Sequence, residues 1–223
     1  MLSRLNKTFV RKTPLLGFIS AYASFTLLAF QHPLLAYALP FIDLGSTQGL
    51  VQLASLQVIQ VALMAMTLLA LSLLPTPVIK AFCIVILFAN AGAAYFMMTY
   101  NAEIDRTMIG NILNTDKREM LQIWHPKLLL QILLFAVLPS LLIWRMQIVK
   151  PRWFIRLGVF FLVLVALIAW AYATAFTWLW FDKHAPRLGG RVLPWSYIAN
   201  TARYFNQAAL AGRVMTESGV WAV

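Results

Sequence analysis

The chain contains five apolar stretches, each long enough to cross a lipid bilayer as a helix. The hydrocarbon core of a bilayer is about 30 Å thick and needs about 20 apolar residues in helical conformation. The stretches that meet this length are 14–38, 50–74, 78–100, 127–149 and 154–181. We therefore predict an all-α membrane protein with five transmembrane helices.

The composition supports this fold class. Hydrophobic residues make up 61% of the 223 residues and charged residues 11%, whereas soluble domains have about 45–50% and about 25%. Too few polar residues remain to cover the surface of a soluble domain. The ten-residue alternation of a membrane β-barrel does not recur. The net charge is +11, but the basic residues are scattered between the spans. They therefore indicate topology signals and contact with anionic lipid, and no nucleic-acid partner is expected.

The distribution of Lys and Arg between the loops predicts the orientation. Nine basic residues fall on the N-terminal side of the spans: Arg4, Lys7, Arg11, Lys12, Lys80, Arg145, Lys150, Arg152 and Arg156. The loop 39–49 carries none, while 101–127 and the tail after 182 together carry the other nine. Charges far along the tail have less effect on the orientation, which the first span usually determines. We expect a cytoplasmic N-terminus and a C-terminus outside.

The N-terminus also has features of a cleaved signal peptide. Residues 1–12 are basic, 15–30 are apolar, and Ala36-Tyr37-Ala38 resembles a small-residue cleavage site. Gln31-His32-Pro33 interrupts the apolar stretch, and a hydrophobic segment continues after it. An N-terminal membrane anchor is therefore the favoured interpretation.

The loop between the third and fourth spans has the strongest chemical pattern. It holds four of the seven acidic residues, namely Glu103, Asp105, Asp116 and Glu119. Ile104, Met108 and Ile112 recur at helical spacing. This pattern predicts one or two amphipathic helices on the outer membrane surface, ending before Pro126.

Three polar residues of this loop are spaced by four. Asn111, Thr115 and Glu119 would form a single stripe on one unbroken helix. The carboxylate could pair with the amine of a lipid headgroup, and the amide and hydroxyl could donate to its phosphate. Two alternatives remain open: a solvated outer face, and a helix break at 114–116 with Thr115 as an N-cap that scatters the stripe.

The loop resembles a known family. Asp105-Arg106-Thr107-Met108-Ile109, followed by Asn111 and Thr115, resembles the N-terminal membrane domain of the lipid A phosphoethanolamine transferases, which include the mobile colistin-resistance enzymes. The resemblance extends over nearly all of 1–210. It includes residues that look like the family's linker: Lys183, Arg187, Arg191, Pro194, Asn200 and Tyr204.

The resemblance implies a function and a place in the cell. Members of the family have five transmembrane helices in the bacterial inner membrane. A periplasmic domain with zinc and a threonine nucleophile follows, and it moves phosphoethanolamine from phosphatidylethanolamine onto lipid A. The resemblance assigns Asn111, Thr115 and Glu119 to the donor headgroup, and Lys183, Arg187 and Arg191 could face lipid phosphates. It implies a membrane domain over 1–182 and a periplasmic linker over 183–223, with phosphatidylethanolamine, lipid A and other membrane lipids as partners.

The catalytic centre of such an enzyme is not expected in this sequence. His32, His125 and His184 are far apart and lack zinc-ligand spacing, and no Ser or Thr has a paired base. No catalytic residue, metal site or cofactor is therefore assigned, and zinc is expected in a catalytic domain or a full-length homologue acting as partner. Whether the chain takes part in an enzyme stays open. The alternatives are a small transporter or a non-catalytic scaffold. The middle of the spans carries no Asp, Glu, Lys or Arg, and its polar residues are mild, as are Gln57, Gln60, Asn90 and Gln131.

Overall fold

A computed structural model describes residues 12–115 and 125–218. Its long helices are α3 (Thr47–Leu71), α4 (Thr76–Tyr100), α9 (Trp153–Ala173) and the continuous stretch Pro126–Arg145, each long and apolar enough to cross a membrane. The last of these comprises α7 (Pro126–Ile132), the π-helical turn η3 (Leu133–Val137) and α8 (Leu138–Arg145). A fifth span is formed if the bent pair at the N-terminus counts as one. The predicted all-α membrane fold is thereby confirmed.

The first span is bent. It consists of α1 (Leu15–Phe30) and α2 (His32–Ala38), followed by the 3-10 turn η2 (Leu39–Phe41), with an angle of 56° between the two parts. Pro33 lies near the start of α2, where its ring cannot continue the hydrogen bonding of α1. The bend therefore falls at the polar interruption that the sequence shows.

The fifth span is shorter than predicted. We expected it to reach residue 181, but α9 ends at Ala173, and the Thr174 hydroxyl donates to the Trp170 carbonyl at 2.8 Å. After the 3-10 turn η4 (Ala175–Thr177), the chain turns into α10 (Trp178–Gly189). The predicted domain boundary between 182 and 183 lies inside this helix.

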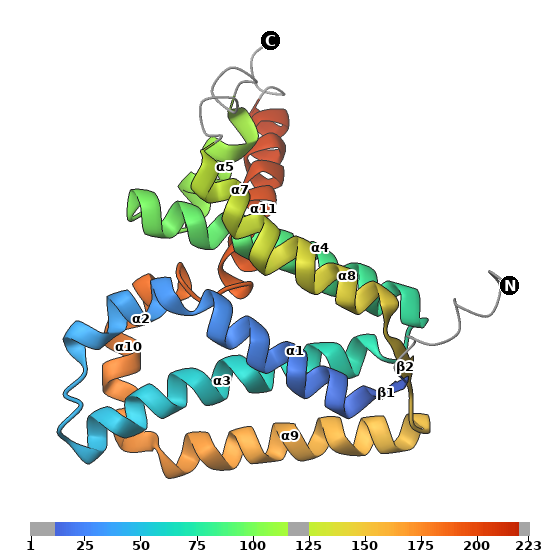
Figure 1. Cartoon of the computed structure of the whole chain (residues 1–223). Coiled ribbons are helices and arrows are strands. Elements are labelled where there is room, and N and C mark those ends of the chain that lie inside the picture. Colours follow the sequence, from blue (N-terminus) through green and yellow to red (C-terminus); the bar gives the residue numbers. More distant parts are fainter. Residues whose placement is uncertain (1–11, 116–124, 219–223) are drawn as a thin grey trace, which may run out of the picture.

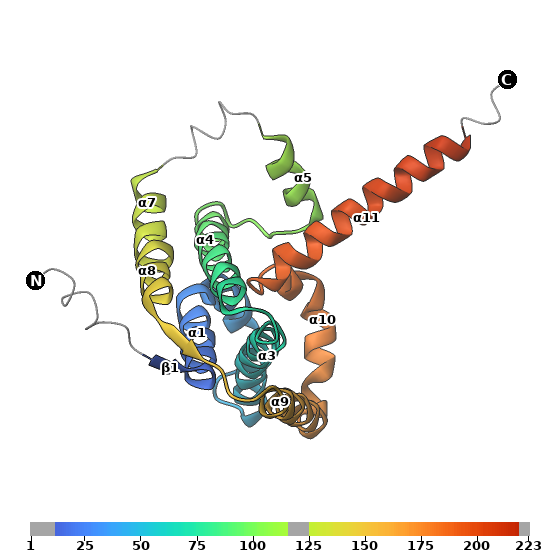
Figure 2. The ribbon, with the colours of Figure 1, turned by 90° about the vertical axis from the view of Figure 1, so that its right-hand side faces the viewer.

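The spans lie side by side in a bundle, with α3 packed against α1 and α9, and α4 against α7 and α8 (Figure 1). The last helix, α11 (Trp195–Ser218), runs across the spans and extends beyond the bundle (Figure 2). This direction is that of a helix lying along a membrane surface. No residue of α9 is buried, as expected for a helix in contact with lipid.

Two short strands, which the sequence did not indicate, connect the N-terminus to a distant loop. Strand β1 (Lys12–Pro14) pairs in parallel with β2 (Gln147–Val149), which joins α8 to α9. Three residues of each strand carry no usable periodicity. Their pairing holds the start of the first span beside the end of the fourth.

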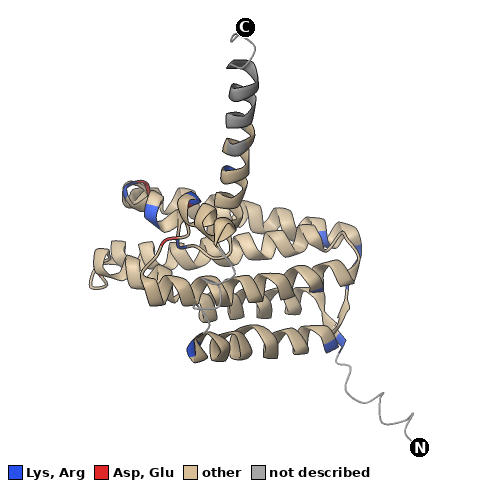
Figure 3. Cartoon of the chain, turned by 90° about the horizontal axis from the view of Figure 1, so that it is seen from above, with Lys and Arg blue, Asp and Glu red and all other residues tan. Residues whose placement is uncertain are grey.

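Basic side chains bind the exposed carbonyls at the same end of the bundle. Lys150 donates to the carbonyls of Ser72 and Leu74 that follow α3, and Arg156 also donates to Ser72. Burial, and then the nearby charge of Arg156, lowers the pKa of Lys150. Figure 3 shows Lys and Arg at both ends of the spans, whereas the described Asp and Glu lie only at the end away from the N-terminus. The α3 C-terminus is therefore capped by cations, which its partial negative charge favours.

We expect Arg156→Ala to lower the stability of the bundle by about 1–2 kcal/mol, because the carbonyl of Ser72 loses a charged donor. Thermal unfolding of the purified protein in detergent micelles measures this as a lower Tm. Arg145→Ala is the control, since Arg145 is exposed in the last turn of α8 at the same end. Equal Tm values for the two variants would contradict the assigned capping role.

Candidate functional site

The loop between α4 and α7 begins with a defined turn and a capped helix. Asn101 ends α4 in the left-handed conformation with φ 49°, which Asn tolerates better than most residues. Helix α5 (Arg106–Asn114) follows, and the Asp105 carboxylate accepts a hydrogen bond from the Met108 N–H at 2.7 Å. Asp105 therefore acts as an N-cap, as its position before a helical pattern suggests.

The segment that leads into α5 is fixed to the connection between α10 and α11. The Ile104 N–H donates to the Gly190 carbonyl at 3.1 Å, and the Asn200 amide donates to the Ile104 carbonyl at 2.7 Å. Ile104 and Asn200 are both buried. Residues that are about 90 positions apart thus hold α5 in place through its backbone.

An ion pair joins the same two segments. The Arg191 guanidinium lies 3.1 Å from the Glu103 carboxylate, with side chains 13% and 31% exposed, and 4.9 Å from the centre of the Tyr37 ring. Arg191 therefore connects α2, the segment before α5 and the segment before α11. Of the three basic residues expected to face lipid phosphates, Arg191 is paired within the protein, whereas Lys183 and Arg187 are exposed.

Helix α11 is bound to α4 and lies close against α5. The Tyr197 hydroxyl donates to the Asn90 side-chain oxygen at 2.9 Å, and Asn90 is fully buried in α4. A Cβ atom on Gly110 would lie 3.1 Å from the Tyr204 ring, so Gly110 allows α5 and α11 to approach closely. A polar residue within a span and a glycine in the loop thus position α5, and the sequence did not single out either for this.

The predicted headgroup residues are only partly placed together. Asn111 is exposed on α5, and the Thr115 hydroxyl donates to its carbonyl at 2.7 Å. The helix ends at Asn114, and Thr115 has an extended backbone with φ −71° and ψ 126°. Glu119 lies outside the described residues. The polar stripe therefore does not continue past Asn114 on one unbroken helix. This agrees with the alternative of a break at 114–116. Thr115, however, follows the end of a helix and was expected to cap the start of one.

The side chains at the end of α5 account for this break. The Asn114 amide donates to the Gly110 carbonyl at 2.8 Å, and Thr115 takes the carbonyl of Asn111. Such bonds offer the backbone an alternative to continuing a helix. Thr115 and Asn111 nevertheless remain neighbours, one turn apart.

The histidines of the chain have structural partners. His184 is buried, stacks on Trp180 with 4.5 Å between ring centres and lies 5.1 Å from the Phe41 ring. His125 accepts a hydrogen bond from the Lys127 N–H at the start of α7. Within 12–115 and 125–218, no three His, Cys, Asp or Glu side chains converge as metal ligands would. We therefore assign no chemical step to a metal in these residues.

Comparison with known proteins gives consistent matches. The family profile described as phosphoethanolamine transferase EptA/EptB matches residues 61–209. Phosphoethanolamine transferase EptA of Helicobacter pylori is 34% identical over 135 residues, which cover 60% of this chain and 26% of that protein. Phosphatidylethanolamine transferase Mcr-1 of Escherichia coli is 34% identical over 76 residues, which cover 34% of this chain and 14% of that protein.

A solved structure shares the fold. It is the integral membrane protein lipooligosaccharide phosphoethanolamine transferase A (EptA) from Neisseria meningitidis, with a TM-score of 0.77 and 17% sequence identity. The match covers 86% of this chain and 36% of that one. The chain thus spans about a third of the solved relative and a smaller share of the curated ones.

We expect Arg191→Ala to loosen α5, because Glu103 then loses its charged partner and Tyr37 its cation. Removing one partner of a half-buried pair should cost about 1–3 kcal/mol. Hydrogen–deuterium exchange should show faster exchange over residues 101–114. Arg187→Ala is the matched control, because Arg187 is exposed four residues earlier. Unchanged exchange in Arg191→Ala would refute the positioning role.

Proposed function

Because this chain belongs to the phosphoethanolamine transferase EptA/EptB family, we propose that it holds the phosphatidylethanolamine donor for transfer of phosphoethanolamine to lipid A. The observation that carries this proposal is the family match over residues 61–209, which includes all of α5. The membrane fold of the Neisseria meningitidis enzyme supports it. A small transporter is not favoured, because the family accounts for both the spans and the loop.

The headgroup contact falls to α5 and the residues after it. Asn111 presents an exposed amide. Thr115 lies beside it, because the Thr115 hydroxyl donates a hydrogen bond to the backbone carbonyl of Asn111. Glu119, four residues further on, would supply the carboxylate for the ammonium group. The bonds of Ile104 and the Glu103–Arg191 pair support this role, since they fix α5 before any lipid binds.

The chemical step needs groups beyond these. Phosphoryl transfer requires a nucleophile and stabilisation of the charge on the phosphate, which a bound metal supplies in many enzymes. We assign both to a periplasmic catalytic unit containing zinc, with α10 and α11 acting as the link to it. A full-length homologue could supply that unit as a partner.

The proposed location is the bacterial inner membrane, with a cytoplasmic N-terminus and a periplasmic α5 and C-terminus. The described charges at the N-terminal end are all basic: Lys12, Lys80, Arg145, Lys150, Arg152 and Arg156. Basic loops stay on the cytoplasmic side. The described acidic residues lie at the opposite end (Figure 3). Glu103 and Asp105, for example, follow the end of α4 and precede α5.

We expect Asn111→Ala and Glu119→Ala each to weaken phosphatidylethanolamine binding about tenfold, because each removes a hydrogen bond to a charged headgroup. Native mass spectrometry of the purified protein, titrated with the lipid, measures the bound fraction. Asn114→Ala and Asp116→Ala are the controls for the amide and the carboxylate. If Asp116→Ala weakens binding as much as Glu119→Ala, the headgroup assignment fails.

A transfer assay on membranes that carry only this chain should give no product, and robust transfer would refute the separate catalytic unit.

The orientation is testable by cysteine labelling, since the only native cysteine, Cys83, is buried. We expect Asn114→Cys to react with a membrane-impermeant maleimide in cells whose outer membrane has been permeabilised. Arg145→Cys should react only after the inner membrane is also opened. The reverse pattern would place the N-terminus in the periplasm.

A further inference from the structure

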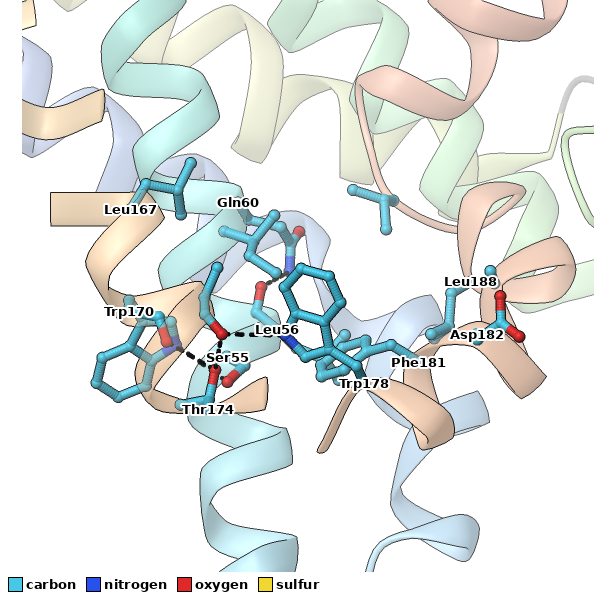
Figure 4. Close-up of a pocket in the computed structure, with 14 residues that line it drawn as sticks. Ser55, Leu56, Gln60, Leu167, Trp170, Thr174, Trp178, Phe181, Asp182 and Leu188 are labelled. Carbon is cyan, nitrogen blue, oxygen red and sulfur yellow. Dashed lines mark hydrogen bonds between the residues drawn. The ribbon is translucent and has the colours of Figure 1, made fainter. Parts of the chain in front are cut away.

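A pocket of about 470 Å³ lies between α3, α9 and α10, away from α5 (Figure 4). Its volume falls within the range of small-molecule sites, about 300–1,000 Å³. The walls come from Leu56 and Ile59 of α3, Leu167 and Trp170 of α9, and Phe181 and Leu188 of α10. These side chains make the lining predominantly apolar.

The pocket reaches from the interior of the bilayer to its surface. Ile59 lies at the centre of α3, whereas Thr174 follows the last residue of α9. Leu167 and Thr174 are seven residues apart, which corresponds to about 10 Å along a helix. The pocket therefore has a buried end suited to hydrocarbon and an end near the headgroups.

Most of the hydrogen-bond donors that line the pocket have partners within the protein. The Trp170 indole donates to the Ser55 hydroxyl at 3.0 Å, and the Trp178 indole to the Ala171 carbonyl at 3.1 Å. The Gln60 amide donates to the Leu56 carbonyl, and the Thr174 hydroxyl donates to the Trp170 carbonyl. A phosphate or sulfate in the pocket would find few free donors.

The charged group that lines the pocket is the carboxylate of Asp182. Asp182 is exposed, and it has no ion pair or hydrogen bond within 12–115 and 125–218. An unpaired carboxylate attracts an ammonium group, which offers three donors and a positive charge. The pocket thus combines an apolar interior with a negative, acceptor-rich mouth.

We propose that this pocket binds a phospholipid with a primary ammonium headgroup. One acyl chain occupies the space between Ile59 and Leu167, and the ammonium group pairs with Asp182. Lipids with anionic headgroups are disfavoured, because no ammonium group offsets the negative phosphate that they place near Asp182. A choline headgroup carries the charge but no N–H donor, so it binds less well.

This site is separate from the proposed donor site. Asn111 and Thr115 lie on and after α5, and neither lines the pocket. The two assignments can therefore fail independently. The two sites share the end of α10 and the connection that follows it. Leu188 and Val192 line the pocket, while Gly190 and Arg191 hold the segment before α5.

Photo-crosslinking in nanodiscs tests the proposal. The probes are phosphatidylethanolamine, phosphatidylcholine and phosphatidylglycerol with the same diazirine-bearing acyl chain. Adducts are mapped by mass spectrometry to the pocket residues and to Leu162 and Val165, which are exposed elsewhere on α9 and report general lipid contact. We expect the ratio of adducts at pocket residues to adducts at the exposed residues to be about two- to fivefold higher for phosphatidylethanolamine than for phosphatidylcholine. This factor corresponds to the contribution of one exposed ion pair to binding.

Two variants identify the cause. Asp182→Asn should make the ratios for phosphatidylethanolamine and phosphatidylcholine equal, and Ala171→Trp should remove pocket adducts by filling the space. Asp43→Asn is the matched control, because Asp43 is an exposed carboxylate that does not line the pocket. Equal ratios for all three lipids in the unmodified protein, or no change in Asp182→Asn, would overturn the proposal. Loss of pocket adducts in Asn111→Ala would show that the two sites are not separate.

Discussion

The hydrocarbon core of the bilayer offers no hydrogen-bond partner, and this constraint shapes several of the contacts between the helices. Polar groups within the spans must find partners inside the protein. The Gln131 amide donates to the Ala91 carbonyl, the Trp170 indole to Ser55, and Tyr197 to Asn90. Each of these bonds also joins two different helices. Satisfying the polar groups and assembling the helices are therefore the same event at these points.

The constraint relaxes at the ends of the spans, where the functional groups lie. At the N-terminal end, Lys150 and Arg156 bind the carbonyls after α3. At the other end, α5, α10 and α11 lie at the surface, where both apolar and charged side chains are stable. The described carboxylates occur at this end, Glu103 and Asp182 among them, whereas the described charges at the other end are all basic.

The sequence predicted the features that depend on neighbouring residues. The spans follow from local hydropathy, and the bend of the first span falls at Gln31-His32-Pro33, where the sequence shows an interruption of the apolar stretch. The pairing of Arg191 with Glu103 could not be predicted, because the two residues are 88 positions apart and either charge alone is consistent with a solvated face. The early end of α9 was missed because apolar residues continue past Ala173, so the composition shows no boundary where the chain turns.

The connection between α10 and α11 gives the clearest link between the lipid-facing bundle and the loop. Leu188 and Val192 line the pocket, and Gly190 and Arg191 bind the segment that leads into α5. Residues that line the pocket and residues that hold the segment before α5 therefore lie within the same five positions of the chain, 188–192. The two sites nevertheless use different side chains, since neither Asn111 nor Thr115 lines the pocket.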